Sequence, residues 1–174
     1  GFGFGDGRDA IQEFRMQNGE SCSVINLGRS AVAAFSDSHE IVSFDGKGWT
    51  FGGAGIDNDD CIYILWGRSF TDDDLEGITS ISTLKLCKYS KNGTLLRSKE
   101  YPLSLTNAQF PFVSGNAAIG VRDGIVLAVF NSVWTKSENG LHHQGSEFIA
   151  ANSDDLSVVS NNNWQGSHSF GISM

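Results

Sequence analysis

The side chains best suited to bind a ligand lie in the last third of the chain. His142 and His143 stand together in a polar stretch, and His168 follows later in the sequence. If a loop brought His143 and His168 together beside a carboxylate such as Glu147, the three would supply the ligands of a zinc site. Their spacing matches no known zinc motif, so hydrogen bonding to loop backbone is the simpler interpretation.

Tryptophans in the same region are candidates for stacking on sugar rings. Trp134 begins a polar stretch, and Trp164 directly follows the asparagines at 161–163. Aromatic rings beside amide groups suit carbohydrate recognition when they are exposed, and packing in the core is the alternative for each. The candidate ligand-binding residues are therefore Trp164, Trp134, His142, His143 and His168.

Two acidic clusters are candidates for calcium binding. The segment Asp57-Asn58-Asp59-Asp60 offers alternating oxygen ligands, although it lacks the glycine and the distant glutamate of a standard calcium loop. The second cluster lies at 72–76. Calcium held by Asp57 and Asp59 is the one cofactor the sequence suggests. The alternative is a solvated acidic face that pairs with the basic residues of the hairpin at 85–99.

Charge and missing motifs narrow the classes of function. The net charge of −8 and the pI of about 4.8 disfavour nucleic acid and anionic membrane surfaces as partners. No apolar run approaches the ~20 residues of a membrane helix, so we expect no membrane insertion. The sequence has no G-x-S-x-G elbow and no phosphate loop. Paired carboxylates for glycoside hydrolysis remain open, because their separation cannot be read from sequence.

Short β-strands joined by tight turns must position these residues. The chain has 21 glycines and only 2 prolines, a balance typical of many tight turns. The continuous apolar run at 61–66 predicts a strand buried on both faces, and Asn92-Gly93 predicts a hairpin with a type I′ turn. Residues 9–16 alone show helical spacing. Alternation predicts strands at 22–27, 31–35, 40–44, 49–51, 61–66, 81–89, 95–101, 117–121, 125–130, 147–151, 156–160 and 167–172.

The three cysteines do not form a disulfide framework, because their number is odd and no C-x-x-C spacing occurs. Cys61 and Cys87 lie in apolar strand patterns, which favours buried free thiols. One disulfide with one free thiol is the alternative.

A weak internal repeat suggests how the strands are grouped. The segment 60–66 aligns with 123–129, a shift of 63 residues, and 84–86 falls against 148–150. The repeat units would be about 52–114 and 115–174. A repeated four-stranded sheet is the blade of a β-propeller, so we predict an all-β fold of propeller-type blades, with a β-sandwich as the alternative. About three blades fit the length, which makes the chain a single domain, a fragment of a larger propeller or a self-associating part of one.

Residues 39–50 resemble the Asp-box hairpin of sialidase-type propellers. Ser43, Asp45, Gly46 and Trp49 would fill the roles of the motif, although glycine precedes the tryptophan where the family usually has threonine. The resemblance implies a structural turn within a propeller blade. Phe14-Arg15-Met16 resembles the early arginine segment of sialidases, in which a guanidinium binds a sugar carboxylate.

Residues 123–170 look like repeats in uncharacterised secreted bacterial propeller-like proteins, which implies an extracellular or cell-surface location. This resemblance implies no known chemistry. From the candidate residues themselves we expect a non-catalytic binding or surface module that recognises a carbohydrate or a protein and can form a homo-oligomer. A carbohydrate-acting hydrolase of sialidase type is the alternative. A purely structural part of a larger protein is the third possibility.

Overall fold

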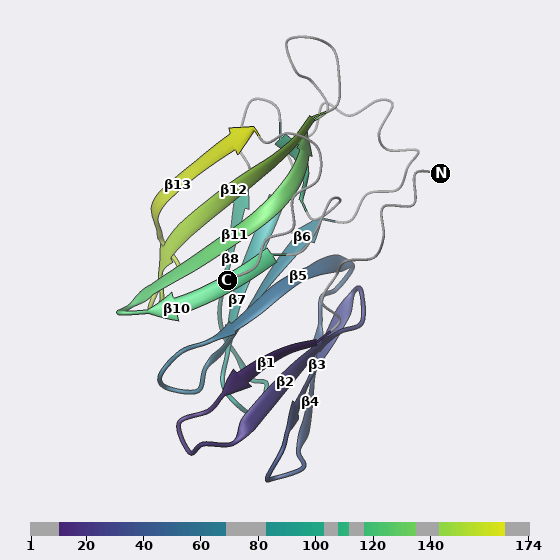
Figure 1. Ribbon diagram of the computed structural model, residues 1–174, viewed down its shortest axis with the longest axis vertical. Coiled ribbons are helices and arrows are strands. Elements are labelled where there is room, and N and C mark those ends of the chain that lie inside the picture. The colour runs from purple at the N-terminus through teal and green to yellow at the C-terminus, as the bar shows by residue number, and fades with distance from the viewer. Residues whose placement is uncertain (1–10, 69–82, 103–107, 112–116, 135–142, 166–174) are drawn as a thin grey trace.

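The computed structural model describes residues 11–68, 83–102, 108–111, 117–134 and 143–165. These residues form antiparallel β-strands and no helix, which confirms the all-β prediction. Twelve strands form three four-stranded sheets in which each strand pairs with the next in sequence, and one further strand pairs at the side of the third sheet. The predicted alternative, a β-sandwich, has two sheets, whereas the described residues form three. Figure 1 shows the sheets following one another along the long axis of the molecule.

The strands of each sheet follow sequence order. The first sheet contains β1 (Ile11–Arg15), β2 (Ser21–Asn26), β3 (Ser30–Phe35) and β4 (Ile41–Asp45). The second sheet contains β5 (Trp49–Ile56), β6 (Ile62–Arg68), β7 (Thr83–Tyr89) and β8 (Leu95–Pro102). The third sheet contains β10 (Ala117–Arg122), β11 (Ile125–Trp134), β12 (His143–Asn152) and β13 (Val158–Gln165), with the short β9 (Ala108–Pro111) paired to β11.

The predicted helix at 9–16 is wrong, because its described part is strand β1. Gln12 and Phe14 are half-buried while their neighbours are exposed, which is the alternation of a strand with one covered face. The helical spacing is confined to residues 9–16, whereas β1 pairs along its whole length with β2, which satisfies the backbone hydrogen bonds on that side of β1. The strand predicted at 167–172 lies outside the described residues.

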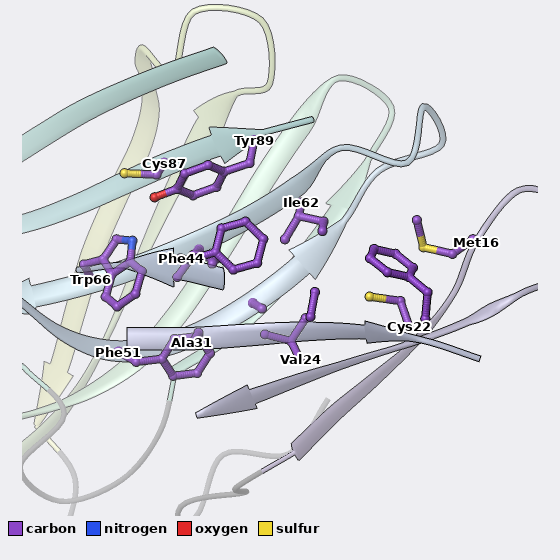
Figure 2. Close-up of a cluster of buried hydrophobic side chains, with 14 residues drawn as sticks. Met16, Cys22, Val24, Ala31, Phe44, Phe51, Ile62, Trp66, Cys87 and Tyr89 are labelled. Atoms are coloured by element: carbon purple, nitrogen blue, oxygen red, sulfur yellow. The ribbon is translucent and has the colours of Figure 1, made fainter. Parts of the chain in front are cut away.

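The second sheet is covered on both faces, as the apolar run at 61–66 predicted. Ile62, Ile64 and Trp66 of β6 belong to a buried cluster shared with the first sheet (Figure 2). Tyr63 and Leu65 point the other way, into a cluster shared with the third sheet. Strand β6 therefore links two separate cores, because alternate residues of a strand face opposite sides of the sheet.

Backbone packs directly on backbone where the second and third sheets meet. A Cβ atom on Gly53 of β5 would lie 2.2 Å from the carbonyl oxygen of Ala117 in β10. A Cβ on Gly55 would lie 2.7 Å from Cγ2 of Ile119. Strands β5 and β10, the first strands of the second and third sheets, can approach this closely only because β5 carries glycine at both positions.

The sequence repeat identifies equivalent strands but misplaces one of them by a residue. Strands β6 and β11 are both second strands of their sheets, and β7 and β12 are both third strands. The shift of 63 residues matches Tyr63, which faces the third sheet, with Val126, which faces the second. A one-residue slip exchanges the two faces of a strand, so only an even shift preserves them. The match of 84–86 with 148–150 is an even shift of 64 residues, so it preserves the faces of the strand.

Two turn predictions need correction. The Asp-box-like segment joins β4 to β5, which lie in different sheets, and therefore does not form a hairpin within one sheet. Asp45 Oδ1 still accepts a hydrogen bond from the backbone N–H of Lys47 at 2.8 Å, as expected of an aspartate that organises a turn. The Asn92-Gly93 hairpin is confirmed, but only Gly93 has a positive φ there, so the turn is not type I′.

Replacing Gly53 with alanine should destabilise the protein, because the new methyl group overlaps the backbone of β10. Overpacking of this kind costs about 1–3 kcal/mol. Gly120→Ala in β10 is the matched control, since nothing lies within 4 Å of its Cβ position. Urea unfolding followed by circular dichroism measures both variants. Equal stability of Gly53→Ala and wild type would contradict the close backbone contact.

Candidate functional site

The sheets have two distinct ends. At the turn end, short turns join β1 to β2, β3 to β4, β5 to β6, β7 to β8, β10 to β11 and β12 to β13. The opposite end, which we call the loop end, is where β2 leads to β3, β4 to β5, β6 to β7 and β11 to β12, and the last two of these connections, 69–82 and 135–142, are the longest between neighbouring strands of a sheet. Binding residues in many folds lie on such connections, where a rigid scaffold positions them.

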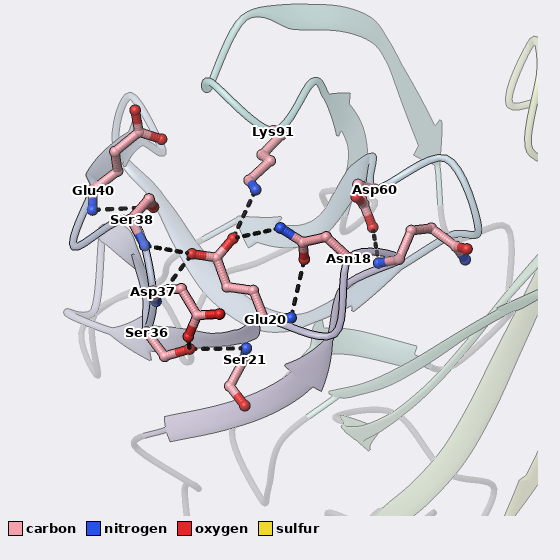
Figure 3. Close-up of polar contacts among 10 residues, drawn as sticks. Asn18, Glu20, Ser21, Ser36, Asp37, Ser38, Glu40, Asp60 and Lys91 are labelled. Carbon is pink, nitrogen blue, oxygen red and sulfur yellow. Dashed lines mark hydrogen bonds and ion pairs between the residues drawn. The ribbon is translucent and has the colours of Figure 1, made fainter.

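A buried carboxylate joins the first two sheets at the turn end. Glu20 is only 1% exposed, and its Oε1 accepts hydrogen bonds from the backbone N–H groups of Asp37 at 3.1 Å and Ser38 at 2.8 Å (Figure 3). Its Oε2 accepts a bond from Lys91 Nζ at 2.8 Å. Asn18 adds a longer contact at 3.4 Å. Three turns of two sheets therefore converge on one side chain.

These contacts favour the ionised form of Glu20. The hydrogen bond from Lys91, followed by that from the Ser38 backbone, lowers its pKa from the usual 4.5 to about 2, against the opposing effect of burial. A carboxylate held ionised in this way suits a structural role and cannot supply a proton near neutral pH. Sequence analysis missed this pair, because Glu20 and Lys91 are 71 residues apart and no local pattern connects them.

A second polar group joins the second and third sheets at the same end. Asp57 Oδ2 accepts a hydrogen bond from the Tyr63 hydroxyl at 2.9 Å and lies 3.6 Å from Lys88 Nζ. Lys88 Nζ in turn donates to the backbone carbonyl of Ser153 at 3.2 Å, in the turn between β12 and β13. Desolvation, followed by the bond to Asp57, raises the pKa of Tyr63.

The predicted calcium ligand Asp57 already has several protein partners. Its Oδ1 accepts bonds from the backbone N–H groups of Asp59 and Cys61, both at 2.9 Å. The carboxylate thus organises its own turn and links two sheets. Within the part of the chain that the structure describes, no three His, Cys, Asp or Glu side chains are grouped as metal ligands. Calcium at Asp57 and Asp59 therefore gains no support from this geometry and stays a prediction.

The predicted ligand-binding residues that can be placed lie toward the loop end of the third sheet. Trp134, the last residue of β11, is paired with His143, the first residue of β12. Trp164 in β13 is paired with Ser146 of β12, close to the same end. The structure thus pairs Trp134 with His143, although residues 135–142 separate them in the sequence. His142 and His168 lie outside the described residues.

The interior next to this pair is polar, which sequence analysis did not foresee. The hydroxyl of Ser146 donates a 3.0 Å hydrogen bond to Oδ1 of Asn131, and both residues are buried. Glu147 is 1% exposed and is paired with Phe130 in the register. Buried polar groups concentrate at this end of β11 and β12, whereas the middle of the same strands is apolar. Alternation predicted the strands but gave no signal for this change in polarity.

The cysteines do not offer a reactive nucleophile. All three are free, and Cys22 and Cys87 are buried. The prediction of a buried thiol is confirmed for Cys87 but wrong for Cys61, which is half-buried because it lies at the end of the turn before β6. Burial is the main cause that raises the pKa of Cys22 to about 11 and also raises those of Cys61 and Cys87. A raised pKa leaves the thiol protonated, and the thiol is a poor nucleophile.

No protein-family model, curated protein or solved structure matches this chain. Within the described segments, no helix is long and apolar enough to span a membrane. The function therefore has to be argued from the geometry of the sheets and their two ends.

The low pKa of Glu20 predicts a loss of stability in acid. Because the folded-state pKa lies below the usual 4.5, the unfolded chain binds more protons between about pH 4.5 and 2. The stabilisation is complete above pH 4.5 and decreases as the pH falls toward 2. Urea unfolding across this range should show a shallower pH dependence for Glu20→Gln, and a lower stability of that variant at pH 7.

The exposed Glu40 lies in a neighbouring turn, which makes Glu40→Gln the matched control. That variant should keep the wild-type dependence on pH. If Glu20→Gln also kept it, the ion pair with Lys91 would not determine acid stability.

Proposed function

We propose that this chain is a non-catalytic binding module, built of propeller-type blades, that recognises a neutral glycan at the loop end of its third sheet. The observation that carries the proposal is the pairing of Trp134 with His143 at the loop end of β11 and β12. The net charge of −8 favours a neutral sugar over an acidic one. Glycans of this kind are typical ligands of extracellular and cell-surface modules, where we place the protein.

The arrangement of the sheets supports the blade interpretation. Each sheet is a four-stranded antiparallel meander, as a propeller blade is. The sheets follow one another face to face, and the first strands of the second and third sheets make close backbone contact through Gly53 and Gly55. Small residues at the first strand allow successive blades to converge on one side.

A sugar site requires aromatic and amide groups close together, and the third sheet has both. Trp134 and Trp164 lie toward the same end of the sheet, but their register positions are on opposite faces. Trp134 is opposite His143, whereas Trp164 is opposite Ser146, three residues further along β12. Among the asparagines of β13, Asn163 is opposite Glu147 and therefore shares the face of Trp134 and His143. Aromatic rings stack on the apolar faces of sugars while amides bond to their hydroxyl groups, so this combination can define a ligand orientation.

The described charged residues favour binding over a sialidase-type hydrolase. Arg15, which resembles the arginine of sialidases, lies at the turn end and donates a 2.6 Å hydrogen bond to the carbonyl of Gly19 in its own turn. Glu20 is held ionised by Lys91, whereas a catalytic acid needs a raised pKa. A purely structural role would leave the Trp134–His143 pair without a function.

Binding of neutral oligosaccharides tests the proposal. Isothermal titration calorimetry with cello-, chito- and manno-oligosaccharides should detect binding to the wild-type protein. Trp134→Ala should weaken it about tenfold, equivalent to about 1.4 kcal/mol, through the loss of stacking. Trp164→Ala, on the opposite face of the same sheet, should leave the affinity unchanged. His143→Asn should also weaken binding, because His143 is paired with Trp134. His39→Asn should leave the affinity unchanged, because His39 lies in a turn at the opposite end.

Each component of the proposal can fail separately. If no oligosaccharide binds, the ligand class is wrong. If Trp134→Ala binds as the wild type does, or if Trp164→Ala is the variant that loses affinity, the location is wrong. Release of new reducing ends from the oligosaccharides would show catalysis and would overturn the non-catalytic assignment.

A further inference from the structure

The turn between β7 and β8 surrounds the side-chain carbonyl of Asn92 with hydrogen-bond donors. Oδ1 of Asn92 accepts bonds from the Thr94 hydroxyl at 3.0 Å and from the Thr94 backbone N–H at 3.3 Å. The Ser90 hydroxyl donates to the same oxygen. Three donors therefore act on one carbonyl oxygen, in a turn where Asn92 and Thr94 are exposed to water.

The residue after Asn92 supplies a nucleophile for that carbonyl. Gly93 has no Cβ, so its backbone nitrogen can approach the side-chain Cγ of the preceding asparagine without the hindrance that any other side chain would add. A bond between these two atoms closes a cyclic imide and places negative charge on Oδ1 before the side-chain nitrogen leaves. Donors aimed at an oxygen on which charge develops lower the barrier of a step of this kind.

We propose that Asn92 is a self-modification site, at which the chain converts its own asparagine to aspartate or isoaspartate. The backbone nitrogen of Gly93 attacks Cγ of Asn92, and its proton passes through water to the side-chain nitrogen, which leaves as ammonia. One water molecule then opens the cyclic imide. Attack of water at Cγ leaves an ordinary aspartate, and attack at the main-chain carbonyl carbon leaves isoaspartate, in which the backbone runs through the side chain. No atom is oxidised or reduced, and the glycan site is not involved.

The turn between β1 and β2 provides a comparison within the same chain. It contains the same dipeptide, Asn18-Gly19. Gly19 donates its N–H across its turn to Met16 at 3.0 Å, as Gly93 donates to Ser90 at 2.9 Å. The φ angles of the two glycines are 86° and 85°. Whatever protection these bonds give the backbone nitrogen is therefore shared by both turns.

The two asparagines differ in the partners of their side chains. Oδ1 of Asn18 accepts a bond from the backbone N–H of Glu20 at 3.0 Å, and its Nδ2 donates to the buried Glu20 carboxylate at 3.4 Å. The nitrogen that has to leave is thus held at Asn18. Of these two described turns, only the one at Asn92 directs hydroxyl donors at the carbonyl oxygen. We therefore expect Asn92 to react faster than Asn18 in the folded protein.

The modification would change a contact between the first and second sheets. The turn that carries Asn92 meets the first sheet twice. Lys91 Nζ donates to Glu20 at 2.8 Å (Figure 3), and a Cβ atom on Gly93 would lie 2.5 Å from Cγ1 of Val42. Isoaspartate adds one carbon atom to the backbone directly before Gly93. The longer turn should move Gly93 away from Val42 and weaken the junction of the two sheets.

Ageing of the folded protein in mildly alkaline buffer provides the first test. Mass spectrometry of tryptic fragments separates the two sites, because the fragments with Asn92 end at Arg97 and the fragment with Asn18 covers residues 16–29. One donor of this kind contributes about 10²–10³-fold in an enclosed enzyme site, and since this turn is exposed we expect Asn92 to react about tenfold faster than Asn18. An unaged sample, digested in parallel, corrects for modification during digestion.

The unfolded chain is the control for sequence effects. In concentrated urea both turns are lost, so the two asparagines should react at similar rates. If Asn92 remains about tenfold faster in urea, the difference comes from its neighbours in sequence and the proposal is wrong. Equal rates in the folded protein would also overturn it.

Thr94→Val separates a role of the donors from a simple restraint by the turn. The Thr94 hydroxyl bonds to Asn92 Oδ1, and valine removes that donor at nearly the same shape. Loss of the donor should slow the reaction at Asn92, whereas loosening of the turn would speed it up. Asn18 in the same variant should keep its wild-type rate, which controls for global stability. An unchanged or faster reaction at Asn92 excludes the role of the hydroxyl.

The effect on the sheets can be measured on the modified protein itself. Each conversion adds one negative charge, so anion exchange separates modified chains from unmodified ones. Chains with isoaspartate at position 92 should unfold at a lower urea concentration than unmodified chains. Asn92→Asp is the matched control, because it carries the new charge without the extra backbone atom, and it should unfold as the wild type does. Equal unfolding of isoaspartate and unmodified chains would overturn the proposed effect on the junction.

Discussion

The two-sided burial of β6 is the constraint on which the rest of the structure depends. A strand that carries Ile62, Ile64 and Trp66 on one side and Tyr63 and Leu65 on the other cannot lie at a surface. Burying a side chain of this size stabilises the fold by roughly 1.5–3 kcal/mol, so each side needs a covering sheet. The first and third sheets meet this need, and each buries only one of its own faces in doing so.

The contact between neighbouring sheets combines two different kinds of interaction. Apolar packing supplies most of the area but little directional information, since hydrophobic contacts are non-directional. The pair of Glu20 with Lys91 adds geometry, because a buried carboxylate requires its specific donors. Removing one partner of such a pair is costly, even where replacing both partners with apolar residues is not. We therefore interpret the pair as the contact that fixes how the first two sheets align at the turn end.

The sequence predicted the strands well because their signals are local. Alternation, the apolar run at 61–66 and the turn at Asp123-Gly124, where both residues have positive φ, each involve only neighbouring residues. The repeat failed by one residue because the turn before β6 spans 57–61, whereas the turn before β11 has two residues. The helix at 9–16 failed because pairing with β2 lay outside the local pattern.

The candidate site could be predicted only as a list of residue types. Trp134 and His143 became neighbours through a long connection whose length does not determine the register, and the polar interior at Ser146 and Asn131 depends on that register. Composition also does not predict which face of the third sheet packs against the second sheet. The face follows from which alternate residues of β11 are buried, since Val126 faces inward and Leu127 does not. One residue of register thus decides which side chains share a face at the candidate site and which are buried between the sheets.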